Sequence, residues 1–138
     1  MSAETTSAIL LDTHVVVWWQ AGSGQLSAKA RKRLENASNR LVSPVTFWEL
    51  AMLIQKGRVR LDRPTSIWVN DFLSTERVAV AELSPTAAVS AGELVDFHGD
   101  PADRMIVGSA ITANIPLLTK DGKIRDWAKT TRRLNAVW

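Results

Sequence analysis

Short apolar runs alternate with helix start signals along the whole chain, and this alternation limits the fold more than any other feature of the sequence. The candidate strands are residues 7–12, 40–43, 77–83, 115–120 and 134–138. Strands that alternate with helices favour a parallel sheet, because each helix returns the chain to the starting end of the next strand. The sequence therefore predicts an α/β fold, with a mostly parallel sheet of four to five strands flanked by helices on both faces.

Capping residues mark where the helices begin. A capping side chain precedes a proline, as suits the first turn of a helix, at Ser43-Pro44, Ser84-Pro85 and Asp100-Pro101. The predicted helices are residues 14–21, 28–36, 44–56, 65–74, 85–92, 101–114 and 123–129. In the third of these, apolar residues recur at helical spacing and are expected to face the core: Phe47, Leu50, Ala51 and Ile54.

The size and composition indicate one domain, residues 1–138, of 15.2 kDa. The absence of cysteine excludes disulfide scaffolds, thiolate zinc sites and cysteine nucleophiles, and two histidines are too few for a histidine-rich metal cage. Residues 1–6 contain no basic residue, and the apolar stretch that follows is interrupted by Asp12 and His14. Neither a signal peptide nor a membrane span is predicted, so the expected location is cytoplasmic.

Acidic residues stand where the predicted strands end. Asp12 ends the first strand, and Glu49 lies in the first turns of the helix after the second. Asp121 directly follows the strand at 115–120, and Asp100 and Asp103 begin the preceding helix. Because ligand sites in open parallel sheets form at the carboxyl ends of the strands, we expect these carboxylates to converge.

Each of these acids also has a structural explanation, as a helix cap, a partner of the helix dipole, a turn residue or a solvated side chain. Converging carboxylates, however, repel one another and raise each other's pKa unless a cation neutralises them. An oxygen-only cluster suits Mg²⁺ or Mn²⁺, and such ions activate water and stabilise the leaving oxygen in phosphodiester cleavage. The pattern thus favours a metal-dependent enzyme that acts on phosphodiesters.

The charge distribution is consistent with a nucleic-acid substrate. The net charge is +3, and without the four acids Asp12, Glu49, Asp103 and Asp121, ten acidic residues remain against seventeen basic ones. An acidic pocket in an otherwise basic protein suits a phosphate-backbone substrate. Each basic segment, at residues 29–33, 56–60 and 120–133, is interpreted either as a solvated face or as an RNA contact.

Four motifs occur in order along almost the whole chain: LLDTH (10–14), SPVTFWE (43–49), GDPADR (99–104) and LLTKD (117–121). Together they resemble the PIN-domain ribonucleases, and in their details the VapC-type toxins of toxin–antitoxin systems. The resemblance implies an Mg²⁺- or Mn²⁺-dependent endoribonuclease that cleaves RNA, forms a homodimer and is inhibited by a cognate, VapB-like antitoxin. Ala102 stands where this branch of the family often has a larger apolar residue. The site residues that the resemblance implies are the metal-site acids Asp12, Glu49, Asp103 and Asp121, the extra acid Asp100, and the hydroxyl of Thr119 near the metal-bound water.

Two alternatives remain open from the residues themselves. A phosphoryl-transfer enzyme of the haloacid-dehalogenase type would use Asp12 as its nucleophile, although His14 stands where that chemistry usually has a second acid. A PIN-like module that binds RNA without cutting it is the non-enzymatic alternative. A receiver-like domain would leave Glu49 and Asp103 unexplained.

Several further side chains have no single interpretation. His14 is either a proton carrier or a polar contact at the helix start, Arg104 pairs with a site acid or with substrate phosphate, and His98 shows no functional signal. Trp48 lies off the apolar stripe of its helix, and Trp18 and Trp19 cannot both face inward on a short helix. One or two tryptophans are therefore expected to line an exposed groove that receives an amphipathic antitoxin helix.

Overall fold

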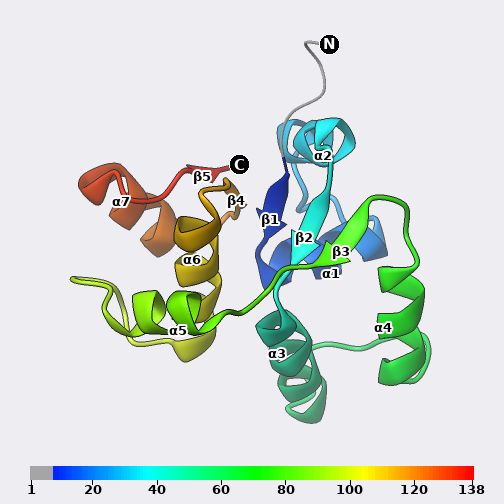
Figure 1. Cartoon of the computed structure of the whole chain (residues 1–138). Coiled ribbons are helices and arrows are strands. Elements are labelled where there is room, and N and C mark those ends of the chain that lie inside the picture. Colours follow the sequence, from blue (N-terminus) through cyan, green and yellow to red (C-terminus); the bar gives the residue numbers. More distant parts are fainter. Residues whose placement is uncertain (1–7) are drawn as a thin grey trace.

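A computed structural model describes residues 8–138, in which strands and helices alternate (Figure 1). The strands are β1 (Ile9–Leu11), β2 (Arg40–Val42), β3 (Val78–Val80), β4 (Leu117–Leu118) and β5 (Ala136–Val137). The helices are α1 (Thr13–Ala21), α2 (Ala28–Asn36), α3 (Pro44–Gln55), α4 (Thr65–Leu73), α5 (Pro85–Gly92), α6 (Pro101–Ala113) and α7 (Gly122–Thr131). Residue 7, where the first predicted strand begins, and residues 1–6 lie outside the described part.

The five strands form one sheet in the order β3-β2-β1-β4-β5, and every neighbouring pair is parallel. This confirms the predicted α/β fold and strand number. The last three strands are shorter than predicted, because only two or three residues of each pair with a neighbour. The parallel arrangement brings the carboxyl ends of β1, β2 and β4 to one edge of the sheet.

Alternate residues of the strands face two separate hydrophobic cores. Leu11 and Leu118 contribute to one core, with residues of α1, α2, α3 and α4. Leu10 and Leu117 contribute to the other, with residues of α6 and α7 and of the loop after α5. Both faces of the sheet are therefore covered, as the sequence predicted.

The predicted helix caps are present. The side chains of Ser27, Ser43, Ser84 and Asp100 each accept a hydrogen bond from a backbone N–H in the first turn of α2, α3, α5 and α6. Asn114 ends α6 in the left-handed conformation, at φ 54°. These short polar side chains satisfy donors that the helix itself cannot pair, so they set where each helix starts.

The predicted inward face of α3 is wrong in part. Leu50 is fully buried and Phe47 and Ile54 pack against the core, but Ala51 is exposed and Thr46 is buried instead. Thr46 and Leu50 are one turn apart, whereas Ala51 lies on the far side of Phe47 around the helix axis. The small side chain of Ala51 has little apolar area to bury, so the helix is rotated toward Thr46.

Helices α5 and α6 approach each other closely at Gly108. A methyl group added there would lie 2.8 Å from the carbonyl oxygen of Ala87 and 2.9 Å from Cβ of Ala91. This contact lets the helix that carries Asp100 and Asp103 pack directly against α5. None of the helices in residues 8–138 is long and apolar enough to cross a membrane.

Candidate metal centre

The five predicted acids line one cleft at the carboxyl ends of the strands. Asp12 and Asp121 are the N-caps of α1 and α7, which directly follow β1 and β4. The cleft has a volume of about 310 Å³, and its walls include the five carboxylates of Asp12, Glu49, Asp100, Asp103 and Asp121. The caps explain the local positions of three of these acids, and the sheet topology explains why they meet.

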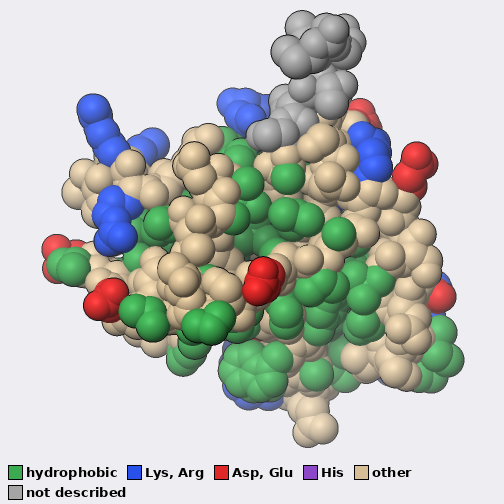
Figure 2. Space-filling model, viewed as in Figure 1, with side chains coloured by type: hydrophobic (Ala, Val, Ile, Leu, Met, Phe, Trp, Pro, Cys, Tyr) green, Lys and Arg blue, Asp and Glu red, His purple; other side chains and the backbone are tan. Residues whose placement is uncertain are grey.

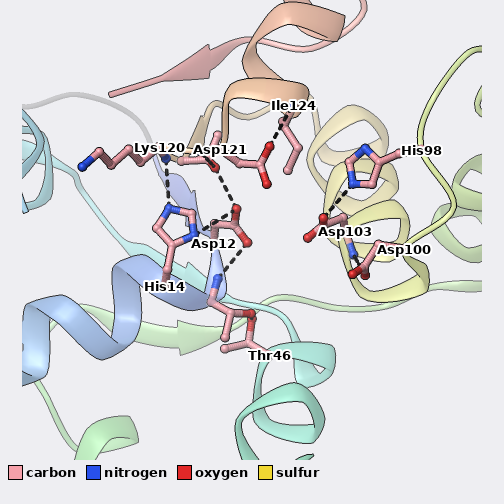
Figure 3. Close-up of polar contacts among 11 residues, drawn as sticks. Asp12, His14, Thr46, His98, Asp100, Asp103, Lys120, Asp121 and Ile124 are labelled. Atoms are coloured by element: carbon pink, nitrogen blue, oxygen red, sulfur yellow. Dashed lines mark hydrogen bonds and ion pairs between the residues drawn. The ribbon is translucent and has the colours of Figure 1, made fainter. Parts of the chain in front are cut away.

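Three of the carboxylates are closest to one another. Glu49, Asp100 and Asp103 each offer a carboxylate oxygen, and these oxygens lie within 4.8 Å of one another. Asp12 and Asp121 face the same space from the ends of β1 and β4, opposite Asp100 and Asp103 on α6 (Figure 3). The site thus has two sides, one formed by strand ends and the other by α3 and α6.

Asp12 is held by hydrogen bonds from two directions. Its Oδ1 accepts the N–H of Thr13 at 2.8 Å, and its Oδ2 accepts the hydroxyl of Thr119 at 2.7 Å. Asp12 is only 3% exposed, and Thr119 is fully buried. The Thr119 hydroxyl also accepts the N–H of Asp121 at 3.0 Å. Thr119 therefore orients Asp12 and the turn that presents Asp121, and it does not itself line the cleft.

His98 holds Asp103, a contact that the sequence did not reveal. His98 Nε2 lies 2.7 Å from Asp103 Oδ2, and because an ionised carboxylate only accepts, the imidazole donates. The Asp103 side chain is 17% exposed. His98 lies in the loop before α6, and Asp103 lies five residues later in its first turn. Neither helical nor strand periodicity therefore connects the two side chains.

The role of Arg104 was left open by the sequence; within residues 8–138 its guanidinium contacts no carboxylate, and it does not line the cleft. Its guanidinium donates to five backbone carbonyls, those of Ala91, Gly92, Leu94, Phe97 and His98. These carbonyls belong to the end of α5 and the loop that follows it. Arg104 thus fixes the loop that presents His98, and its role is structural.

His14 contacts the backbone on the strand side of the site. The N–H of Lys120 donates to His14 Nε2 at 2.9 Å, which places the proton of the neutral ring on Nδ1. Nδ1 lies 3.6 Å from Asp12 Oδ2, too far for a hydrogen bond. Burial lowers the pKa of His14 despite the nearby Asp12 and Asp121. The ring is therefore neutral at pH 7, and the contact at the helix start is its observed role.

Burial, with a smaller contribution from the neighbouring acids, raises the pKa of two of the carboxyl groups. Burial raises the pKa of Asp103 to about 6, and the charges of Asp12 and Asp100 act in the same direction, against the hydrogen bond from His98. Burial also raises the pKa of Glu49, again with Asp12 and Asp100 and against a hydrogen bond with Thr13. The protein alone stabilises the ionised forms of these two carboxyl groups poorly. A bound cation would stabilise them and lower both pKa values.

The donor set fits a hard divalent cation. The cleft offers carboxylate oxygens from α3, α6 and two strand ends, the ligands that Mg²⁺ and Mn²⁺ prefer. Burial and the charges of Asp12 and Asp100 raise the pKa of Glu49 and of Asp103, and a bound cation would oppose both effects. Glu49, Asp100 and Asp103 would hold the ion, with Asp12 and Asp121 on the opposite wall.

Known proteins are similar to this chain in sequence and in fold. The family model of the PIN domain matches residues 9–130. Ribonuclease VapC22 of Mycobacterium tuberculosis is 36% identical over 120 residues, which cover 86% of this chain and 91% of that protein.

Two solved structures share the fold. VapBC2 of Rickettsia felis, bound to a DNA fragment from its promoter, matches with a TM-score of 0.65 and 19% identity, over 94% of this chain and 97% of that one. A toxin–antitoxin complex from Klebsiella pneumoniae matches with a TM-score of 0.64 and 16% identity, over 94% and 96%.

Proposed function

The chain belongs to the PIN-domain family, and from this premise we infer that it is an endoribonuclease toxin of the VapC type that cleaves RNA with Mg²⁺ or Mn²⁺. The observation that carries the proposal is the cleft in which five carboxylates from four elements converge at the carboxyl edge of the sheet. The relation to a ribonuclease supports the substrate class. An RNA-cleaving toxin acts where RNA is found, which agrees with the expected cytoplasmic location.

The side chains of the cleft divide into those that hold the ion and those that orient them. Glu49, Asp100 and Asp103 supply the close oxygens, with Asp12 and Asp121 facing them. Thr119 and His98 hold Asp12 and Asp103 in place by hydrogen bonds of 2.7 Å. When bound, a divalent cation activates water and stabilises the leaving oxygen of a phosphodiester. The protein's part is to hold the carboxylates close together and correctly aimed, and a bound cation would favour their ionised form.

Basic side chains gather around two hollows near the amino ends of β1, β4 and β5, at the edge of the sheet opposite the carboxylate cleft. Arg125, Lys129, Arg132 and Arg133 line a hollow at the end of α7, and Lys29, Lys32 and Arg33 of α2 line another that shares Asn135 with it. Basic side chains project from the α7 end of the molecule (Figure 2). Such surfaces attract the phosphate backbone without reading its sequence.

The geometry disfavours Asp12 as a nucleophile. Both of its oxygens accept short hydrogen bonds, and the residue is almost completely buried.

Digestion of total RNA by the purified protein, with and without Mn²⁺ and with mapping of the new ends, tests the proposed activity. Metal-dependent cleavage at defined positions supports it. RNA binding without any cleavage would instead favour the non-cleaving PIN-like module.

Metal binding should stabilise the folded protein measurably. Mg²⁺ or Mn²⁺ at one hundred times its dissociation constant is expected to add about 2.7 kcal/mol to the free energy of unfolding, because the ion binds only the folded site. Thermal unfolding at increasing metal concentration measures this. Asp103→Asn should weaken the response, whereas Asp126→Asn, an exposed acid of α7 outside the cleft, should keep it. An identical metal response in Asp103→Asn and the unmodified protein would show that the ion binds elsewhere.

We further propose that a VapB-like antitoxin and a second copy of the chain are its protein partners. The neighbouring solved structures are toxin–antitoxin complexes. Trp48 is 53% exposed, as its position off the apolar stripe predicted, and apolar side chains gather over α3 and α5 (Figure 2). Trp19, by contrast, packs edge-on against Phe72 with ring centres 6.1 Å apart. Trp48 is therefore the better candidate for the antitoxin contact.

Loss of the exposed indole should weaken antitoxin binding. Trp48→Ala is expected to reduce the affinity for the cognate antitoxin on the order of 30-fold, the effect of a tryptophan at the centre of an interface. Isothermal titration calorimetry measures the affinity, and RNA cleavage without antitoxin should stay nearly intact. Mg²⁺ and antitoxin should also oppose each other's binding if a basic antitoxin side chain enters the carboxylate cleft. If Trp48→Ala and Trp19→Ala both leave the affinity unchanged in folded protein, the antitoxin groove lies elsewhere.

A further inference from the structure

One wall of the carboxylate cleft is aromatic. His14 and Trp18 line the cleft together with the acids, and their ring centres are 4.8 Å apart. Trp138, which follows β5, lies behind them with its ring centre 6.1 Å from that of Trp18 and 6.3 Å from that of His14. The wall therefore consists of two residues of α1 beside the N-cap Asp12, and Trp138 from the end of β5 packs against them.

The start of α1 explains why this wall adjoins the carboxylates. His14 and Trp18 are four residues apart, so they lie on one face of the helix, one turn after Asp12. His14 is fixed by the N–H of Lys120, which donates to its Nε2 at 2.9 Å. The neighbouring rings and this hydrogen bond hold Trp18 in a defined position on the wall.

The side chain of Lys120 lies over one face of the Trp18 ring. The Nζ of Lys120 lies 5.6 Å from the ring centre, and Lys120 is an exposed residue with a long, flexible side chain. In Figure 3 this side chain extends away from the carboxylates, on the side of the site where His14 lies. A cation–π contact at an exposed position is weak, so another flat group can displace the ammonium from the ring.

We propose that Trp18, backed by His14 and Trp138 and flanked by Lys120, forms a stacking subsite for one unpaired base of the RNA substrate. This inference rests on the proposed ribonuclease function and deepens it. Proteins recognise single-stranded RNA by stacking its bases on aromatic rings, and stacking is tolerant of sequence because every base has a flat face. A base in a duplex is already stacked on its neighbours. The subsite therefore selects single-stranded segments and loops over duplex RNA.

The test removes one base at a time from the substrate. A short single-stranded RNA that the protein cleaves is prepared as a series in which each nucleoside in turn is replaced by an abasic one. With the unmodified protein, one abasic position near the cleaved bond should lower kcat/KM on the order of tenfold, the loss of one stacked base. This measurement needs no variant. Equal kcat/KM for all abasic positions would overturn the subsite.

Substitution of Trp18 then assigns the effect to this ring. Trp18→Leu should lower kcat/KM for the intact RNA by a similar factor and show no further loss at the sensitive abasic position. Trp18→Phe keeps an aromatic face and preserves packing, so this variant should still lose part of its kcat/KM when the base at the sensitive position is removed. Trp48→Leu, which removes an exposed indole outside the cleft, should lose as much there as the unmodified protein does. The melting temperature of each variant reports whether it is folded.

The outcomes separate this subsite from the proposed activity. No cleavage of the intact RNA by the unmodified protein with Mn²⁺ overturns the ribonuclease function, and the subsite with it. Cleavage with the same abasic penalty in Trp18→Leu, Trp18→Phe and the unmodified protein overturns the stacking subsite alone.

Discussion

Asp12→Asn and Asp103→Asn should each lower metal-dependent RNA cleavage at least about 100-fold, because loss of a ligand charge removes several kcal/mol of transition-state stabilisation. Asparagine keeps the shape of the side chain: its single carbonyl oxygen can still accept the N–H of Thr13, and its NH2 group can donate to the Thr119 hydroxyl in place of the bond that Asp12 Oδ2 accepted. Folding should therefore survive. Initial rates on a defined RNA at saturating Mn²⁺ measure the effect.

The same variants offer an internal control for stability. Since burial raises the pKa of Asp103 to about 6, its ionised form is costly in the metal-free protein at pH 7. Asp103→Asn should thus be at least as stable as the unmodified protein without metal, while being inactive. Asp126→Asn, the matched change outside the cleft, should keep full activity. Cleavage by Asp103→Asn at the unmodified rate would exclude Asp103 from the metal site.

Gly108→Ala should lower the free energy of unfolding by about 1–3 kcal/mol, the usual cost of overpacking a tight contact. The added methyl group would meet the backbone of Ala87 and Ala91 at 2.8 Å, and backbone atoms cannot move aside as a flexible side chain can. The two helices would have to separate. Chemical denaturation measures the change.

Gly92→Ala is the matched control for this substitution. Gly92 also belongs to a helix, but a methyl group there meets nothing within 4 Å. Alanine favours the helical conformation over glycine by roughly 1 kcal/mol, so Gly92→Ala should be neutral or stabilising. If both substitutions are stabilising, the close approach of α5 and α6 at Gly108 is not a real constraint.

The outline of the site was predictable because it depends on local signals and on topology. Asp12, Asp100 and Asp121 are the N-cap residues of three helices. An N-cap needs only a short polar side chain at the helix start, so these positions could be predicted from the sequence. Parallel strands have their carboxyl ends on one edge, so acids at several strand ends must approach one another. Glu49 and Asp103, in the first turns of α3 and α6, follow from the same argument. For these residues, spacing along the chain was sufficient.

The contacts that orient the site were not predictable in this way. His98 showed no signal in the sequence, yet it holds Asp103 at 2.7 Å because Arg104 fixes the intervening loop through five backbone carbonyls. Arg104 itself suggested a charge partner and has none among the site acids. Both roles depend on the path of an irregular loop, which no periodic pattern describes.

The sequence by itself determined the parallel α/β fold, the helix starts and which carboxylates meet, since these follow from periodicity, capping and the direction of the strands. Only the tertiary structure decided that Thr119 points at Asp12, that α3 buries Thr46 in place of Ala51, and that Trp18, Lys120 and Trp138 meet beside the acids. The physical reason is that each of these contacts depends on the rotation and side-chain direction of separate elements. Spacing within one element fixes which residues share its face, but not which face of another element they meet.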